Sequence, residues 1–228
     1  QAMHNDKVSV RLINIGKGRP EGVVIKVIDR NKTQFVGTLK IIGNKTILIP
    51  DNVRSGVEIE IVDNKLSTAV NGVKALVKIT VWPQSSARPF GEIVEVLGFP
   101  GTNDVEMLSI LYNQGIDPKF PNEVLEEAEY VSIDLDDTEI AKRRDFRDVL
   151  TFTIDPFDAK DFDDAISYRK LKNGNFELGV HIADVSHYVR PGSKMDEEAL
   201  KRSNSVYLVD RVIPMLPEQL SNIACSLR

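Results

Sequence analysis

The chain has 228 residues and a net charge of −5, and its 42% hydrophobic and 28% charged residues are typical of one to three folded domains. This composition excludes a mainly disordered chain, and the apolar runs are far shorter than the roughly 20 residues of a membrane helix. A single cysteine, Cys225, excludes an intrachain disulfide and a cysteine metal cluster. We therefore expect a protein of a reducing compartment, the cytoplasm, with no membrane segment.

The charge is divided unevenly along the chain. Residues 1–114 hold 14 Lys and Arg against 11 Asp and Glu, whereas residues 115–228 hold 15 against 23. The first part shows no strong basic stripe, so its mixed charge is that of an ordinary surface. The acid of the second part is concentrated in one short stretch, which is the first indication of function.

Residues 7–15 alternate between apolar and polar side chains, as a strand does. Residues 17–20, Lys-Gly-Arg-Pro, are typical of a linker. Because no partner strand precedes this segment, we interpret residues 1–19 as the last strand of a preceding domain with its linker.

Residues 20–113 contain evenly spaced runs of alternating character, of which 23–27, 57–61 and 73–81 are the clearest. Short strands separated by glycine-containing turns, with no long helix, predict a closed or nearly closed antiparallel barrel of five or six strands. The candidates are the oligonucleotide-binding barrel and the SH3-like barrel, and about six strands favour the former.

From residue 114 the pattern mixes helices and strands. We expect a helical linker over 114–148, with one helix beginning at Pro121 and a second short helix within 136–147. Residues 149–228 predict an α+β domain. Its expected elements are a strand at 151–154, a hairpin of 165–171 and 176–185 with an Asn-Gly turn, and a helix at 193–203 capped by Ser193.

The acidic stretch places five carboxylates in the ten residues from Asp155 to Asp164. Carboxylates packed together repel one another unless a cation neutralises them, and Mg²⁺ takes carboxylate, water and phosphate oxygens. A metal-assisted phosphodiester hydrolysis needs such an arrangement. A solvated acidic loop is the alternative, although flanking Ile154, Phe162 and Ala165 favour a loop anchored at a folded edge. An EF-hand is a poor fit, because the stretch lacks the required Gly and Glu.

These residues resemble the metal-binding signature of the ribonuclease II/ribonuclease R family of exoribonucleases, in Thr153 to Pro156 and Lys160 to Ala165. The resemblance extends over His181 to Val189, Ser203 to Tyr207, Ile213 to Pro217 and Leu220 to Asn222. Upstream, residues 20–24, 81–83 and 91–98 resemble the second cold-shock-like barrel of the ribonuclease R branch. The resemblance covers nearly the whole chain and implies that residues 1–19 belong to a preceding cold-shock domain.

The resemblance implies a processive, hydrolytic 3′-to-5′ exoribonuclease that uses Mg²⁺ and releases nucleoside 5′-monophosphates from the 3′ end of single-stranded RNA. Asp155, Asp161, Asp163 and Asp164 match the four acidic active-site positions. Asp155 and Asp164 are implied as direct metal ligands and Asp163 as indispensable for the chemistry. Tyr207 matches the aromatic that stacks on the terminal base, and Asp158 falls between matched positions as a surface acid.

The family's catalytic domain continues beyond the matched segment, so residues 149–228 correspond to its N-terminal portion. We therefore interpret the chain as an internal fragment with little activity of its own. A second class of function remains open, an RNA-binding barrel module or a catalytically inactive scaffold. The complete set of four acids favours the enzyme, because a degenerate scaffold is expected to have lost at least one.

Other candidate residues have a structural alternative. His181 and His187 are interpreted as structural, and Cys225 as a small buried residue. Trp82 and Phe90 either stack on RNA or pack in the core. The basic cluster, defined as Lys142, Arg143, Arg144 and Arg147, either guides an RNA backbone or forms a solvated helix face.

Overall fold

The computed structural model describes residues 2–14, 19–52, 57–62, 70–83, 88–157, 159 and 162–227. The chain divides into two compact units, Gln1–Pro118 and Lys119–Arg228, each with its own core. No helix in the described part of the chain has the length and apolar character needed to cross a membrane.

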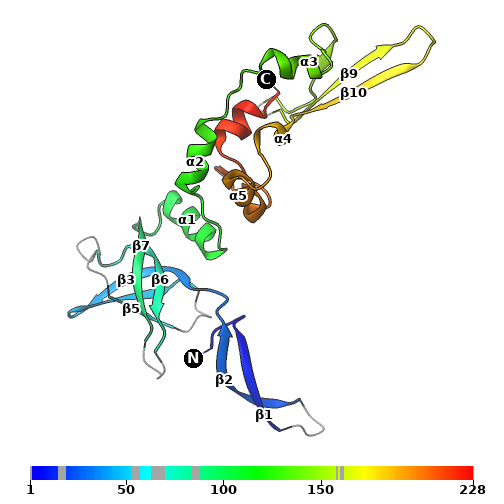
Figure 1. The fold of residues 1–228 in the computed structure, drawn as a ribbon. Helices are drawn as coiled ribbons and strands as arrows, with labels where there is room; N and C mark the ends of the chain where they lie inside the picture. The colour runs from blue at the N-terminus through cyan, green and yellow to red at the C-terminus, as the bar shows by residue number, and fades with distance from the viewer. Residues whose placement is uncertain are drawn as a thin grey trace. The chain divides into compact units, whose positions relative to one another are not determined.

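The first unit begins with a hairpin of β1 (Lys7–Asn14) and β2 (Glu21–Asp29), drawn in blue in Figure 1. These strands form a two-stranded sheet of their own, so the barrel does not begin at residue 20 as expected. Likewise, β1 finds its partner downstream and is not a lone strand. The alternation in residues 23–27 predicts a strand correctly, but a period of two does not specify the strand with which it pairs.

A buried carboxylate stabilises the base of this hairpin. Asp6 accepts hydrogen bonds from the backbone N–H groups of Met3 and Asn31 and from the Arg30 guanidinium at 2.7 Å. Burial alone would raise the pKa of Asp6, but these hydrogen bonds outweigh it and lower that pKa. The Arg30 guanidinium also lies 3.7 Å from the centroid of the Trp82 ring.

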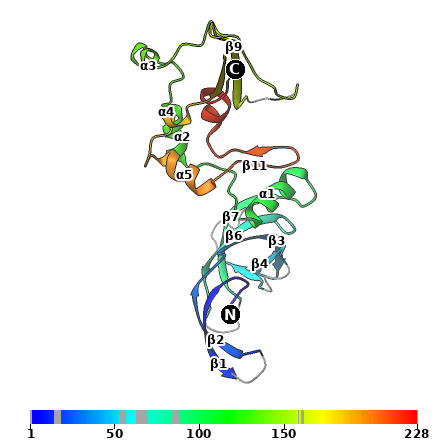
Figure 2. The same cartoon turned by 90° about the vertical axis from the view of Figure 1, so that its right-hand side faces the viewer.

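Five strands close into a barrel in the order β3-β4-β5-β7-β6. They are β3 (Gln34–Ile42), β4 (Lys45–Pro50), β5 (Ile59–Ile61), β6 (Lys74–Val81) and β7 (Phe90–Gly98). Figure 2 labels β3, β4, β6 and β7 of this barrel. Five strands in a non-sequential order confirm the oligonucleotide-binding barrel. One detail differs from the expected antiparallel barrel, because β5 and β7 pair in parallel.

Alternate side chains of these strands fill the barrel interior, including fully buried Leu39, Leu48 and Val77. Gly37 of β3 lies opposite Pro50 of β4. A Cβ atom at this position would stand 2.2 Å from the carbonyl oxygen of Ile49, so any larger residue would displace the strand backbone.

Helix α1 (Asn103–Asn113) follows the barrel and was not expected from the sequence. It packs on a second cluster, in which Tyr112 meets Val36 and Leu76 of the barrel. Lys74 ties the helix to the barrel, because its buried ammonium pairs with Glu106 at 2.8 Å and Asp51 at 3.0 Å. The start signal was present, since Asp104 and Glu106 are acidic residues of the first turn.

The second unit begins with two helices near the expected positions. Helix α2 (Asn122–Glu129) follows Pro121, and α3 (Asp137–Lys142) is shorter than the expected segment 136–147. Asp136 caps α3 by accepting the N–H of Glu139 at 2.8 Å.

A three-stranded antiparallel sheet of order β10-β9-β8 follows, and Figure 1 shows β9 and β10 as a long hairpin in yellow. The strands are β8 (Thr151–Phe152), β9 (Asp164–Lys170) and β10 (Phe176–Ile182), which confirms the expected hairpin. One face packs inward through Ala165 and Ser167. The opposite face, here called the apolar sheet face, is exposed and carries Phe152, Tyr168, Phe176, Leu178, Val180 and Ile182.

The remaining elements complete the second unit, whose core is largely helical. They are α4 (Val185–Tyr188), α5 (Lys194–Arg202), the β11–β12 ribbon (Val206–Tyr207 and Val212–Ile213) and the π-helix η3 (Gln219–Ala224). Ser193 caps α5 as expected by accepting the N–H of Asp196. Met195 of α5, Leu216 and the fully buried Leu220 of η3 pack against Val124 and Ala128 of α2.

Candidate active site

The acidic loop runs between two strands that pair with each other. Phe152 at the end of β8 lies opposite Ile166 of β9, and the chain re-enters the sheet at Asp164. Because β8 and β9 are antiparallel neighbours, the two ends of the loop are held at one end of the sheet. This topology places Asp155 in the outgoing arm of the loop and Asp163 in the returning arm.

The described carboxylates of the loop face solvent. Asp155, Asp163 and Asp164 are exposed, and none of their carboxylates has a hydrogen bond or ion pair with another described residue. Asp161, the fourth expected ligand, and Asp158 lie outside the described residues. Ala165 is buried as expected of an anchor, but Ile154 is 80% exposed and therefore does not anchor the loop.

Phe162 anchors the loop, as expected, and it does so through its backbone. Its N–H donates to the Ser226 hydroxyl oxygen at 3.3 Å, and its carbonyl accepts the Leu227 N–H at 2.9 Å. No signal in the sequence could have identified this contact, because Phe162 and Ser226 are 64 positions apart. The loop is thus fixed next to Asp163.

The donor set fits Mg²⁺ in its chemistry. The described candidates are carboxylate oxygens without a competing cation, and hard divalent cations prefer oxygen ligands. The described residues do not by themselves assemble a centre, since no three His, Cys, Asp or Glu side chains among them lie close enough to hold an ion. The expected ligand set remains a prediction that includes Asp161.

Tyr207 lies on β11, opposite Val212, and its side chain is 73% exposed. An exposed ring has a face available for stacking, as the expected role requires. Tyr207 belongs to a two-stranded sheet separate from the one that bears Asp164.

Acidic partners neutralise the basic cluster. Lys142 and Arg143 pair with Glu139, Arg143 also pairs with Asp184, and Arg144 pairs with Glu177 at 2.6 Å. Arg147 binds Asp145 at 2.6 Å and lowers the pKa of that carboxyl to about 2. These pairs favour the structural interpretation over an RNA-guiding surface.

Both histidines of the second unit contact protein groups. The His181 ring lies 2.8 Å from the Ser167 hydroxyl and packs edge-on against Phe146. His187 is half-buried, 3.8 Å from Glu139 and edge-on to Tyr188. The geometry therefore supports the structural interpretation of His181 and His187.

The barrel aromatics are also engaged by the protein. Trp82 packs against the barrel core, and Arg30 covers one of its faces. Phe90 is half-buried, whereas Phe99, for which no role was expected, is 60% exposed. Core packing is thus the interpretation that the contacts of Trp82 favour.

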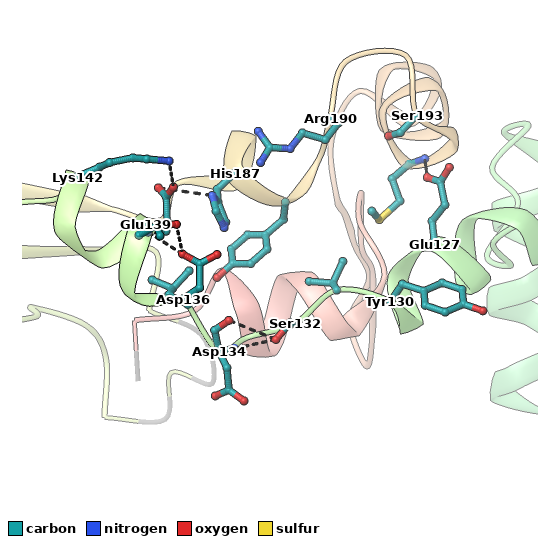
Figure 3. Close-up of a pocket in the computed structure, with 15 residues that line it drawn as sticks. Glu127, Tyr130, Ser132, Asp134, Asp136, Glu139, Lys142, His187, Arg190 and Ser193 are labelled. Carbon is teal, nitrogen blue, oxygen red and sulfur yellow. Dashed lines mark hydrogen bonds and ion pairs between the residues drawn. The ribbon is translucent and has the colours of Figure 1, made fainter.

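A pocket of about 610 Å³ lies beside α3 and α4, and Figure 3 shows its charged lining. Many of these side chains bind one another or the backbone. Glu139 accepts from Lys142, Asp136 caps α3, and Glu127 accepts the N–H groups of Lys194 and Met195 at 3.0 and 2.8 Å. The described contacts of the pocket lining are therefore helix caps and ion pairs, which stabilise the fold.

Two protein families match successive parts of the chain. Residues 47–121 match the cold shock domain and residues 143–228 match the RNB domain. Ribonuclease R of Thermotoga maritima is 40% identical over 228 residues, which cover 99% of this chain and 32% of that protein. The chain therefore spans about a third of the length of this relative.

Solved structures also show similarity to ribonuclease R. The chain is similar to Mycoplasma genitalium RNase R in complex with ribose methylated single-stranded RNA, with a TM-score of 0.85 and 28% identity over 100% of this chain and 36% of that one. It is also similar to yeast Ssd1, a pseudonuclease, with a TM-score of 0.64 and 25% identity over 98% of this chain and 29% of that one.

Proposed function

Because the chain belongs to the ribonuclease II/ribonuclease R family, we propose that the whole protein is a hydrolytic exoribonuclease. The observation that carries this proposal is the similarity to ribonuclease R, which covers 99% of this chain and so includes the barrel and the acidic loop. On the same basis we propose the direction, processivity, products and location of this activity. The enzyme degrades single-stranded RNA processively from its 3′ end, releases nucleoside 5′-monophosphates and acts in the cytoplasm.

In this proposal Asp155, Asp161, Asp163 and Asp164 hold Mg²⁺, which supplies the positive charge that activates a water molecule and stabilises the leaving oxygen. The described acids support this role because they are solvent-exposed and unpaired, whereas the acids next to the basic cluster are neutralised. Asp163 orients the attacking water, and Tyr207 positions the terminal nucleotide by stacking on its base.

The experiment incubates the full-length protein with single-stranded RNA labelled at its 3′ or its 5′ end and measures the labelled products. With Mg²⁺ present, 3′-labelled RNA should release labelled mononucleotide at once. The 5′-labelled RNA should yield its label only in a short final product, without intermediates of middle length. Release of 5′-terminal mononucleotide first, or internal cleavage, would contradict the proposed direction.

A catalytically inactive RNA-binding scaffold is the second candidate. The similarity to the pseudonuclease Ssd1 favours it, because this fold also occurs in a protein without nuclease activity. The same labelled RNA separates the two functions. A scaffold would retain RNA in a binding assay and leave both labels intact, whereas the enzyme consumes the RNA.

A further inference from the structure

The acidic loop is held by a segment that follows the π-helix, through three residues here called the loop clamp: Phe162, Ser226 and Leu227. The Ser226 hydroxyl oxygen accepts the Phe162 N–H at 3.3 Å, and the Leu227 N–H donates to the Phe162 carbonyl at 2.9 Å. Both backbone polar groups of Phe162 are therefore used by one short segment. Two such bonds restrain the rotation of this residue as well as its position.

The segment that holds Phe162 is itself fixed in the core of the second unit. Leu220 of η3 is fully buried among Met195 and Leu216, and the Cys225 N–H donates to the Leu220 carbonyl at 2.8 Å. Ser226 follows Cys225 directly. The loop clamp thus connects the acidic loop to the packed helical core.

The loop clamp restrains the backbone with neutral groups. Carboxylates close together repel one another, so a loop that carries several of them tends to spread unless it is held. Some acids elsewhere in this unit are paired with cations, as Asp145 is with Arg147 and Glu177 with Arg144. A hydroxyl and an N–H group fix the loop without neutralising the charge of Asp163.

We propose that Ser226 is a positioning residue, which holds the Phe162 backbone and thereby sets where the Asp163 carboxylate stands for metal binding. This inference rests on the proposed function, because it assigns the purpose of the restraint to the metal site. Ser226 acts through the backbone of Phe162 and does not touch the substrate.

The test uses amide hydrogen exchange and Mg²⁺ calorimetry on the full-length protein. In the wild type, the Phe162 and Leu227 amides should exchange at least about tenfold more slowly than that of Phe157, a fully exposed residue of the same loop. Ser226→Ala should speed exchange at Phe162 and weaken Mg²⁺ binding, each by about fivefold, the effect of one lost hydrogen bond. Ser226→Thr keeps the hydroxyl and should restore both values.

Ser132→Ala is the matched control. It also removes a hydroxyl that accepts a backbone N–H, that of Asp134 at 3.2 Å, but in the segment after α2. This variant should change neither Phe162 exchange nor Mg²⁺ binding. Equal effects of Ser132→Ala and Ser226→Ala would overturn the proposal. An unprotected Phe162 amide in the wild type would also overturn it, and this measurement does not require Ser226→Ala to fold.

The outcomes separate this inference from the proposed function. If the wild type releases mononucleotides and Ser226→Ala has wild-type exchange and Mg²⁺ binding, the positioning role is refuted and the enzyme stands. If Ser226→Ala behaves as expected but the wild type releases no mononucleotide, the positioning role stands and the nuclease is refuted. A wild type that binds no Mg²⁺ overturns the positioning role.

Discussion

Asp163 directly follows Phe162, whose backbone is held by hydrogen bonds to a distant part of the chain. We expect Asp163→Asn in the full-length protein to abolish RNA hydrolysis, with a loss of at least about 1,000-fold, and to leave RNA binding largely intact. The amide keeps the shape of the side chain but removes the negative charge needed to hold a cation and its activated water. Mononucleotide release and filter binding measure the two effects. Wild-type rates would refute the assigned role.

We expect a different role for Tyr207, because its ring is exposed and carries no charge. Tyr207→Ala should retain hydrolysis but lengthen the final product, since the base would lose a stacking partner worth about 1–3 kcal/mol. Product lengths on a sequencing gel check this expectation. Tyr207→Phe is the control and should give the wild-type product, because it keeps the aromatic face.

The features of the candidate site differ in how far the sequence indicates them. The carboxylate pattern from Asp155 to Asp164 is local, so the sequence alone indicated the chemistry. The Phe162–Ser226 contact and the pairing of Arg144 with Glu177 depend on how distant segments fold together, and no local pattern specifies them.

At the scale of elements, an ion-paired lysine of β6, Lys74, adds to the apolar packing that holds α1 on the barrel. Lys74→Met should lower the free energy of unfolding by about 1–2 kcal/mol, because it leaves the Asp51 and Glu106 carboxylates without their cation. Both acids are partly hydrated, which keeps the loss below that of a fully buried pair. Lys78→Met, at an exposed position of the same strand, is the control and should change stability little. Urea unfolding at pH 7 measures both variants.

The same contact makes the stability of the first unit depend on pH. The hydrogen bond from Lys74 lowers the pKa of Glu106 below its ordinary 4.5, so the pair stabilises the fold above that pH and is lost as the pH falls through the folded-state pKa. For Lys74, burial would lower the pKa, but Glu106 and Asp51 outweigh burial and raise it above its ordinary 10.5. Its contribution is therefore lost only above about pH 10.5. Glu106→Gln should flatten the acid limb of an unfolding curve measured from pH 3 to 6.

The elements also show which predictions a single sequence supports. The runs 57–61 and 73–81 match the barrel strands β5 and β6, and the β9–β10 hairpin was predicted correctly, because alternation and an Asn-Gly turn are local signals. The run 23–27 is a strand as well, but it lies outside the barrel. The partner of β2 and the parallel β5–β7 pair were not predicted. Alternation indicates which face of a strand is buried, but it does not specify which strand lies beside it. Helix α1 was missed because its residues were included in the expected all-strand barrel.

For the whole molecule, charge limits the affinity for RNA. The chain has 29 Lys and Arg against 34 Asp and Glu, and its basic cluster is neutralised by ion pairs. We expect the 228-residue chain to bind single-stranded RNA weakly, with a slope of log K against log salt of about −2, as for about three phosphate contacts. Titrations at two salt concentrations measure this slope. Tight, salt-independent binding would contradict it.

The chain alone should also degrade RNA far more slowly than the full-length protein. Its described residues gather no group of three metal ligands, and it spans about a third of the length of its ribonuclease R relative. The comparison is mononucleotide release at equal molar concentration with Mg²⁺. Robust processive degradation by the chain would show that the essential residues all lie within it.

The apolar sheet face has a thermodynamic consequence for this chain. Its aromatic and aliphatic side chains, such as Phe176, Leu178 and Ile182, are already hydrated in the folded state. Unfolding adds little new water contact there, and newly hydrated apolar surface is what raises the heat capacity on unfolding. A typical protein of 228 residues would gain roughly 3 kcal/mol/K, and calorimetry of this chain should give a clearly smaller increment. Its stability curve is therefore flatter with temperature than its length implies.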